Sequence, residues 1–259
     1  MPLNWTAKWI WASGASPADY NDTIRACREF ALEEVGPALL AITADSFYRL
    51  IINGRWVCDG PCRSWDFHHQ YDVVDVSPFL VAGQNQMEIL ARYYGAGYLH
   101  KRPMHPGLLA QLDVASSVPK TIGTDARWIV ARVGAVLRNV PKIALQMEPL
   151  EIQDARLPDD SAQAATEYFT TDRAPWTNLN PRDVAMLTMQ PVALRSHLWS
   201  RVVQRDWMAF NFSPVRTFHP ALMEADGFTC MGGVAVSYTH LRAHETKANV
   251  VCRLLLEKK

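Results

Sequence analysis

The stretch FYRLIINGRWV, residues 47–57, contains the clearest fold signal in the chain. Asn53 and Gly54 stand between two runs rich in aromatic and β-branched residues. A two-residue type I′ turn needs positive φ at both central positions, and Asn-Gly adopts that conformation readily. The stretch therefore predicts a β-hairpin, and β-structure becomes the starting hypothesis for the residues on either side.

Short runs typical of β-strands extend in both directions from this hairpin. They are Lys8–Trp11, Ile24–Leu32, Ala38–Thr43, Tyr71–Val76, Leu108–Val114 and Thr124–Ala131. Near Ser77-Pro78 we expect a short helical turn, and after Gly83 a strand in which Met87, Ile89 and Ala91 share one face. Many short strands at roughly ten-residue spacing predict a mostly β protein built as an antiparallel β-sandwich of the jelly-roll kind.

The composition of the sequence changes between Asp154 and Arg182. Residues 157–183 read LPDDSAQAATEYFTTDRAPWTNLNPRD and contain three prolines and few aliphatic side chains. Such a stretch is typical of an ordered surface excursion or a linker. A β-like run at 191–203 then begins what reads as another unit. We therefore expect a β-sandwich domain over 1–190 and the start of a second, truncated β-sandwich over 191–235.

The last segment, 236–259, does not continue this pattern of strands. It begins VSYTHLRAHET, ends CRLLLEKK, and resembles the translation of a transposase-based sequencing adapter with its index and flow-cell primer. We therefore expect a non-native tail and a natural reading frame cut near Ala235. The alternative is a basic amphipathic C-terminal helix. Under the first interpretation His240, His244 and Glu245 are not metal ligands.

Composition and charge exclude several classes of protein. The 49% hydrophobic and 20% charged residues indicate a globular chain rather than a disordered one. Lys and Arg number 26, as do Asp and Glu, so no overall positive field indicates nucleic acid or an anionic membrane as a partner. Without 236–259 the net charge becomes −3. No signal peptide or membrane-length apolar run is found, so a cytoplasmic location is expected, with a signal peptide lost upstream as the alternative.

Motifs for cofactors and metals are missing from the sequence, and we expect neither. Glycine-rich nucleotide loops and the nucleophile elbow are absent. Cys58 and Cys62 lack the second pair of ligands that a structural zinc site requires, so free thiols are expected. His68 and His69 are adjacent and point in different directions on a strand or loop, so we interpret them as surface-loop histidines.

Glu148, Glu151 and Asp154 are the carboxylates with the most suggestive spacing, because glycoside hydrolysis usually needs a pair of carboxyl groups. They would share one face of a helix, but Pro149 interrupts any helix here. We interpret them instead as a polar edge on which Arg156 is an ion-pair partner. No catalytic residue is assigned.

Aromatic side chains near strand ends and turns are the candidate binding residues. Sugars present C–H faces that stack on aromatic rings, and the loops of a sandwich carry its binding sites. The carbohydrate-binding candidates are Trp56, Trp65, Tyr93 and Tyr94. A regular strand would place one ring of the Tyr93-Tyr94 pair outward. For each residue the alternative is ordinary packing.

One set of segments occurs in a fixed order along 1–235. It comprises WTAKWIW (5–11), ITADSFYRLIINGRWVCDGPCRS (42–64), YDVVDVSPFLVAGQNQMEILARYYG (71–95), PGLLAQLDV (106–114), TDARW (124–128), EIQDAR (151–156) and PRDVAMLT (181–188). In combination these segments resemble the N-terminal region of bacterial α-L-rhamnosidases. The sequence departs from the family pattern at Gln153, where an aromatic residue is usual.

The resemblance implies a non-catalytic, galactose-binding-like β-sandwich that helps to recognise substrate or braces the enzyme. Another β-sandwich and an (α/α)6 barrel would follow, and carboxylates of that barrel would hydrolyse terminal α-L-rhamnose with inversion. The implied partners are a rhamnose-containing carbohydrate and the missing C-terminal catalytic domain, and the chain alone is expected to be inactive. The alternatives are a stand-alone carbohydrate-binding module and a purely structural module.

Overall fold

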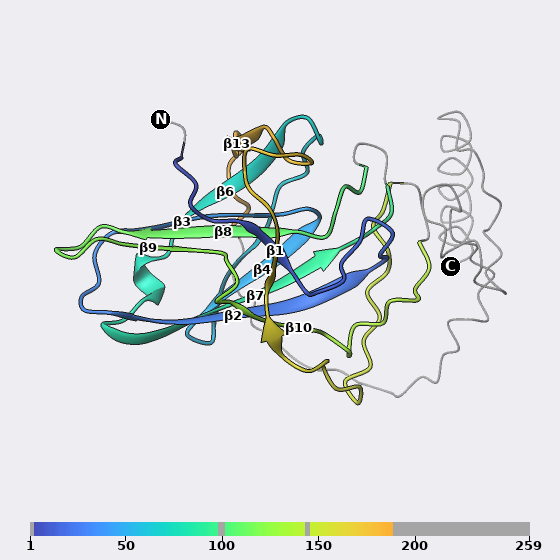
Figure 1. Ribbon diagram of the computed structural model, residues 1–259, viewed down its shortest axis with the longest axis horizontal. Coiled ribbons are helices and arrows are strands. Elements are labelled where there is room, and N and C mark those ends of the chain that lie inside the picture. Colours follow the sequence, from blue (N-terminus) through green and yellow to red (C-terminus); the bar gives the residue numbers. More distant parts are fainter. Residues whose placement is uncertain (1–2, 98–101, 143–145, 189–259) are drawn as a thin grey trace, which may run out of the picture.

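The structure, a computed structural model, describes residues 3–97, 102–142 and 146–188, which fold as two facing β-sheets (Figure 1). Within these ranges the 3-10 helix η1 (Ser77–Phe79) is the one helical element. The predicted mostly β, antiparallel sandwich is confirmed. The expected second unit at 191–235, the domain boundary at 190 and the adapter-like tail lie outside the described residues.

The first sheet contains seven of the described strands. In spatial order these are β12 (Thr166–Phe169), β1 (Trp9–Trp11), β8 (Leu108–Val114), β3 (Ala38–Ala44), β6 (His69–Asp75) and β13 (Leu179–Pro181), and β9 (Lys120–Gly123) pairs with β8. Neighbouring strands are antiparallel except β13, which lies parallel to β6. The sheet therefore combines strands from both ends of the described chain.

The second sheet contains six of the described strands, all antiparallel. Their order is β11 (Gln163–Ala164), β10 (Ile129–Arg132), β2 (Asp22–Leu32), β7 (Gly83–Tyr93), β4 (Phe47–Ile52) and β5 (Arg55–Gly60). In the middle, β2 and β7 pair continuously from Asp22↔Tyr93 to Leu32↔Gly83. Figure 1 shows β2, β4 and β7 in one layer and β3, β8 and β9 in the other.

The predicted hairpin is confirmed as the β4–β5 connection. Asn53 has φ 50° and Gly54 has φ 72°, which are the positive values that a type I′ turn requires. Asn53 also exchanges hydrogen bonds of 2.9 Å with the backbone of Gln86. The turn residue therefore attaches the hairpin to β7 as well as reversing the chain.

The core lies between the sheets and follows the period of two expected for strands. Leu40 and Ile42 of β3 point inward, and so do Met87, Ile89 and Ala91 of β7, as predicted for the last three. Leu39, which directly precedes Leu40, is half-exposed on the outer face of the first sheet. The apolar pattern of these strands thus fixes which face is buried.

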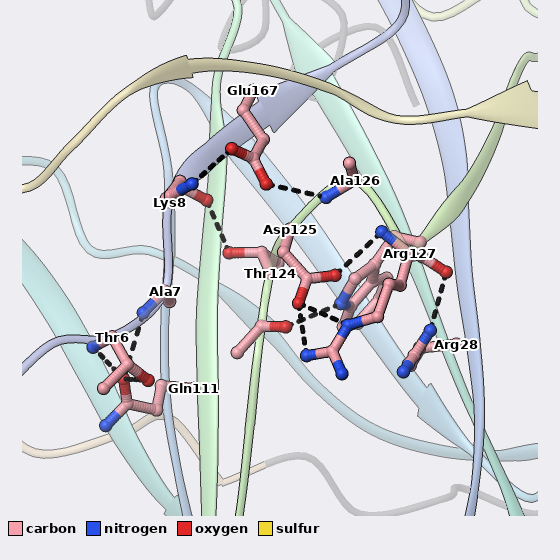
Figure 2. A network of polar contacts seen from close by, with 12 residues as sticks. Thr6, Ala7, Lys8, Arg28, Gln111, Thr124, Asp125, Ala126, Arg127 and Glu167 are labelled. Atoms are coloured by element: carbon pink, nitrogen blue, oxygen red, sulfur yellow. Dashed lines mark hydrogen bonds and ion pairs between the residues drawn. The ribbon is translucent and has the colours of Figure 1, made fainter.

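Polar side chains join the edge strands around the TDARW segment, residues 124–128 (Figure 2). Asp125 accepts hydrogen bonds of 2.8 Å from the backbone and side chain of Arg127, and this closes a turn. Glu167 accepts from Ala126 at 3.0 Å and pairs with Lys8. The prediction of one strand over Thr124–Ala131 is therefore wrong, because the Asp125 side chain bonds the turn and β10 begins only at Ile129.

Residues 157–183 form edge strands of both sheets, so they are an ordered part of the sandwich and not a linker. β11 belongs to the second sheet and β12 to the first, and between them the Ala165 amide donates to Trp128 O at 2.8 Å. Further along, Trp176 is fully buried against Trp9 on the outer face of the first sheet. Among the described residues, no helix has the length and apolar character to cross a membrane.

One buried thiol and three buried tyrosine hydroxyls make the stability of the fold decrease at high pH. Burial raises the pKa of the Cys58 thiol from 9.0 to about 11. Burial also raises the pKa values of Tyr48, Tyr20 and Tyr93 well above the usual 10.0. The folded chain holds these protons at pH values where the unfolded chain releases them, so their stabilising contribution is present below about pH 9 and is lost above it.

We expect the free energy of unfolding to fall between about pH 8 and about pH 10.5. In Cys58→Ala the fall should be smaller by about 1–2 kcal/mol, because one of these protons is gone. Urea unfolding at the two pH values measures this decrease for the wild-type chain and for Cys58→Ala. An equal decrease in the two proteins would contradict the assignment to Cys58.

Candidate functional site

The most exposed aromatic pair in the described chain lies in the turn Trp65-Asp66-Phe67-His68, called here the aromatic turn. Trp65 is 52% exposed and Phe67 is 67% exposed. Their rings are 13° from parallel with centroids 5.8 Å apart. Both rings are exposed next to one another and near-parallel, so they form one aromatic surface.

Hydrogen bonds hold the aromatic turn on the edge of the first sheet. The His68 amide donates to Trp65 O at 3.1 Å, which closes the turn. Asn178, beside β13, donates from Nδ2 to Phe67 O at 2.9 Å and accepts at its own carbonyl from the His69 amide at 3.0 Å. The turn is thus attached to a strand that lies more than 100 residues further along the chain.

An ion pair flanks the two rings. Arg102 donates to Asp66 Oδ2 from Nη2 at 2.6 Å and from Nε at 3.2 Å. These hydrogen bonds hold the pKa of Asp66 below its usual value. The Asp66 carboxylate also accepts from the Phe67 amide at 3.0 Å, so it stays charged and keeps the turn closed.

Trp56, the other exposed candidate, lies on a different element. It is part of β5, 40% exposed, and its Nε1 donates to Asp59 Oδ1 at 2.9 Å. Arg49 pairs with the same carboxylate at 2.8 Å. No hydrogen bond or ring contact of the described residues joins Trp56 to Trp65, so the structure does not bring these two candidates together.

Tyr93 and Tyr94 are both buried, so the expectation that one ring points outward is wrong. β7 ends at Tyr93, whose hydroxyl donates to Pro17 O at 3.1 Å. The alternation stops there, and the Tyr94 ring lies under the Arg92 guanidinium with Cζ 5.3 Å from its centroid. Neither ring has a free face on which a sugar could stack.

The carboxylates of 148–154 are all paired with arginines. Glu148 pairs with Arg63 at 3.5 Å, Glu151 with Arg92 at 3.4 Å and Asp154 with Arg156 at 2.6 Å. Hydrogen bonds from Arg156 lower the pKa of Asp154 to about 2. A general acid needs a pKa raised toward neutrality, which is the opposite shift. The interpretation as a polar edge is confirmed.

His69 is buried, so its interpretation as a surface-loop residue is wrong. It begins β6, and its Nε2 lies 3.1 Å from Thr43 Oγ1 beneath the rings of Trp9 and Trp176. His68 is half-buried in the aromatic turn. Across the described ranges, no three His, Cys, Asp or Glu side chains gather closely enough to hold a metal ion.

A groove of about 640 Å³ runs over the outer face of the first sheet. Its apolar lining includes Leu39, Tyr71 and Val73, and Asp113 is the one carboxylate among the lining residues. Glycoside hydrolysis by the usual route needs two carboxyl groups across a sugar. This groove therefore does not contain the groups for that reaction.

Phe67 and Arg102 belong to the candidate site and were missed from the sequence. The closeness of Trp65 and Phe67 in the sequence, one on each side of Asp66, was a usable signal. No such signal exists for Arg102, since its ion pair with Asp66 spans 36 positions of the chain. Of the predicted candidates, Trp65 lies in this site, Trp56 is exposed elsewhere, and Tyr93 and Tyr94 are in the interior.

Comparisons with known proteins find larger solved structures that contain a similar sandwich. No protein-family model matches the chain, and no curated protein matches it by sequence. Among solved structures, a GH78 family rhamnosidase of Bacillus sp. GL1 matches with a TM-score of 0.66 and 32% identity over 71% of this chain. An α-L-rhamnosidase of Aspergillus terreus matches with a TM-score of 0.53 and 22% identity over 65% of this chain, and shows the same fold. The chain covers 20% and 22% of these two enzymes, and its sandwich is therefore similar to one part of each of them.

Proposed function

We propose that this chain is the N-terminal accessory part of a larger glycoside hydrolase that removes terminal α-L-rhamnose from glycosides or polysaccharides. The observation that carries the proposal is the likeness to the Bacillus rhamnosidase, at 32% identity over 71% of this chain and 20% of that enzyme. The partners are then a rhamnose-containing carbohydrate and a catalytic domain outside this chain. The sandwich helps to recognise the substrate.

The polar groups of the sandwich support a non-catalytic role. Its carboxylates at 148–154 are engaged by arginines, and the pKa of Asp154 is lowered. An inverting or retaining glycosidase needs one carboxyl group that stays protonated near neutral pH. The pKa of Asp154 is shifted in the opposite direction by its hydrogen bonds from Arg156, so Asp154 is not suited to be that group.

We expect the purified chain to release no phenol from an aryl α-L-rhamnoside above the uncatalysed blank. The reason is that the groove over the first sheet has one carboxylate, Asp113, among its lining residues, whereas the reaction needs two carboxyl groups. A complete α-L-rhamnosidase in the same assay is the positive control. Turnover that disappears in Glu148→Gln or Glu151→Gln would overturn the accessory role, because it would place the catalytic groups in this chain.

A further inference from the structure

We propose that the aromatic turn, together with Arg102, is a binding platform for a neutral saccharide, and specifically for a 6-deoxyhexose such as a terminal rhamnose. The ligand class rests on the proposed function. The location rests on the geometry of Trp65, Phe67 and the ion pair beside them.

Trp65 and Phe67 are the most exposed aromatic side chains among the residues that the structure describes. Four other tryptophans, Trp9, Trp11, Trp128 and Trp176, are fully buried. Trp9 and Trp176 show what a closed stack looks like here, with centroids 3.8 Å apart. The centroids of Trp65 and Phe67 are 5.8 Å apart, so the rings are offset and each keeps open surface. Open, near-parallel rings are suited to the C–H face of a pyranose.

The aromatic turn is held in place before any ligand arrives. Asn178 bonds it to the segment before β13, and Ser64 Oγ accepts from the Gln70 amide at 3.2 Å on the other side. Asp66 closes it internally through the Phe67 amide. A rigid loop loses little conformational entropy on binding, which favours a weak ligand such as a monosaccharide unit.

The charges at the platform favour a neutral ligand. Asp66 and Arg102 neutralise one another, so this pair adds no net charge beside the rings that would select an anion. The Arg102 side chain is 84% exposed. It uses Nε and Nη2 to donate hydrogen bonds to Asp66, so the other N–H groups of its guanidinium can donate to sugar hydroxyls. Phe67 has no polar group and is suited to the methyl group of a 6-deoxyhexose.

The test is an NMR titration of the full 259-residue chain with methyl α-L-rhamnoside, followed through the backbone amide and indole N–H signals, so that Trp65→Ala can be measured through the amides around the turn. We expect saturable shifts of the Trp65 signal. Trp65→Ala and Phe67→Ala should each weaken binding at least about tenfold, and Arg102→Met about two- to fivefold. Trp56→Ala is the matched control, since it also removes a half-exposed indole, and it should change affinity less than about twofold.

Three results would overturn the proposal, the first two for the site and the third for its ligand. The first is a wild-type chain whose indole signals do not move. The second is equal weakening by Trp56→Ala and Trp65→Ala. The third is binding of methyl α-D-galactoside as tight as that of the rhamnoside, which would remove the 6-deoxyhexose from the proposal. The proposed accessory function is tested by a separate experiment, the aryl α-L-rhamnoside assay, in which release of phenol by this chain would contradict it.

Discussion

Replacing Arg182 with methionine is expected to lower the free energy of unfolding by about 3–5 kcal/mol. Asp72 is fully buried in β6, and Arg182 Nε and the Tyr48 hydroxyl both donate to its carboxylate. Methionine fills much of the space of arginine but leaves that carboxylate without its cation. A buried charge without its counter-ion costs far more than an exposed one. Urea unfolding at neutral pH measures the loss.

Arg156→Met is the matched control, because Arg156 also pairs with an aspartate in the same C-terminal part of the sandwich. Its side chain is 88% exposed, so the loss should be far smaller than in Arg182→Met. Adding Asp72→Asn to Arg182→Met should restore part of the stability, since the amide carries no charge. If Arg182→Met costs no more than Arg156→Met, the buried pair does not stabilise the fold.

The same pair explains why two distant sequence segments were informative together. YDVVDV at 71–76 supplies Asp72, and PRDVAMLT at 181–188 supplies Arg182. The Arg182 amide also donates to Tyr71 O at 2.8 Å, so it continues the attachment of β13 to β6. Neither segment alone indicates this contact. The resemblance to rhamnosidases used both segments together, and so it reflected a contact that the local propensity of either segment does not predict.

Local sequence was sufficient where a structural feature is made by neighbouring residues. The Asn53-Gly54 turn depends on the φ values of two residues, and the inward face of β7 depends on alternation within one strand. The predictions failed where a distant contact decides the outcome. Arg92 donates to the carbonyl of Leu150 at 2.8 Å, and this contact helps to enclose Tyr94 where a strand pattern would have left one tyrosine exposed.

In the candidate site, too, some features follow from the local sequence and others depend on distant contacts. Trp65 was found because it lies near a turn and has a large ring, which are properties of the local sequence. Its exposure and its pairing with Phe67 depend on Asn178 and Arg102, which lie far along the chain. Asn178 falls in 157–183, the stretch whose polar composition is also typical of a linker. Trp176 is a large apolar side chain in that stretch, but a single aromatic residue does not predict that the stretch packs on the sandwich.

Trp176→Ala is expected to lower the free energy of unfolding by about 3–5 kcal/mol, the usual cost of removing a large buried aromatic side chain. Trp176 is fully buried, and its ring stacks on Trp9 with centroids 3.8 Å apart and an interplanar angle of 20°. Its edge contacts Phe169 of β12. A Cβ on Gly107 would come within 2.5 Å of Trp176, so the ring also lies close against the backbone before β8. Removing the ring leaves a cavity lined by several strands.

The effect should be greatest where Trp176 holds 157–183 on the outer face of the first sheet. β13 pairs with β6 over three residues, which is too short a ladder to be stable without the packing beside it. Amide exchange at His69, whose N–H donates to Asn178 O, should therefore accelerate in Trp176→Ala. Trp56→Ala removes a half-exposed indole and should cost less than about 1 kcal/mol without changing that amide. Similar losses in the two variants would mean that Trp176 adds little, and that 157–183 is attached to the sandwich by its edge-strand hydrogen bonds alone.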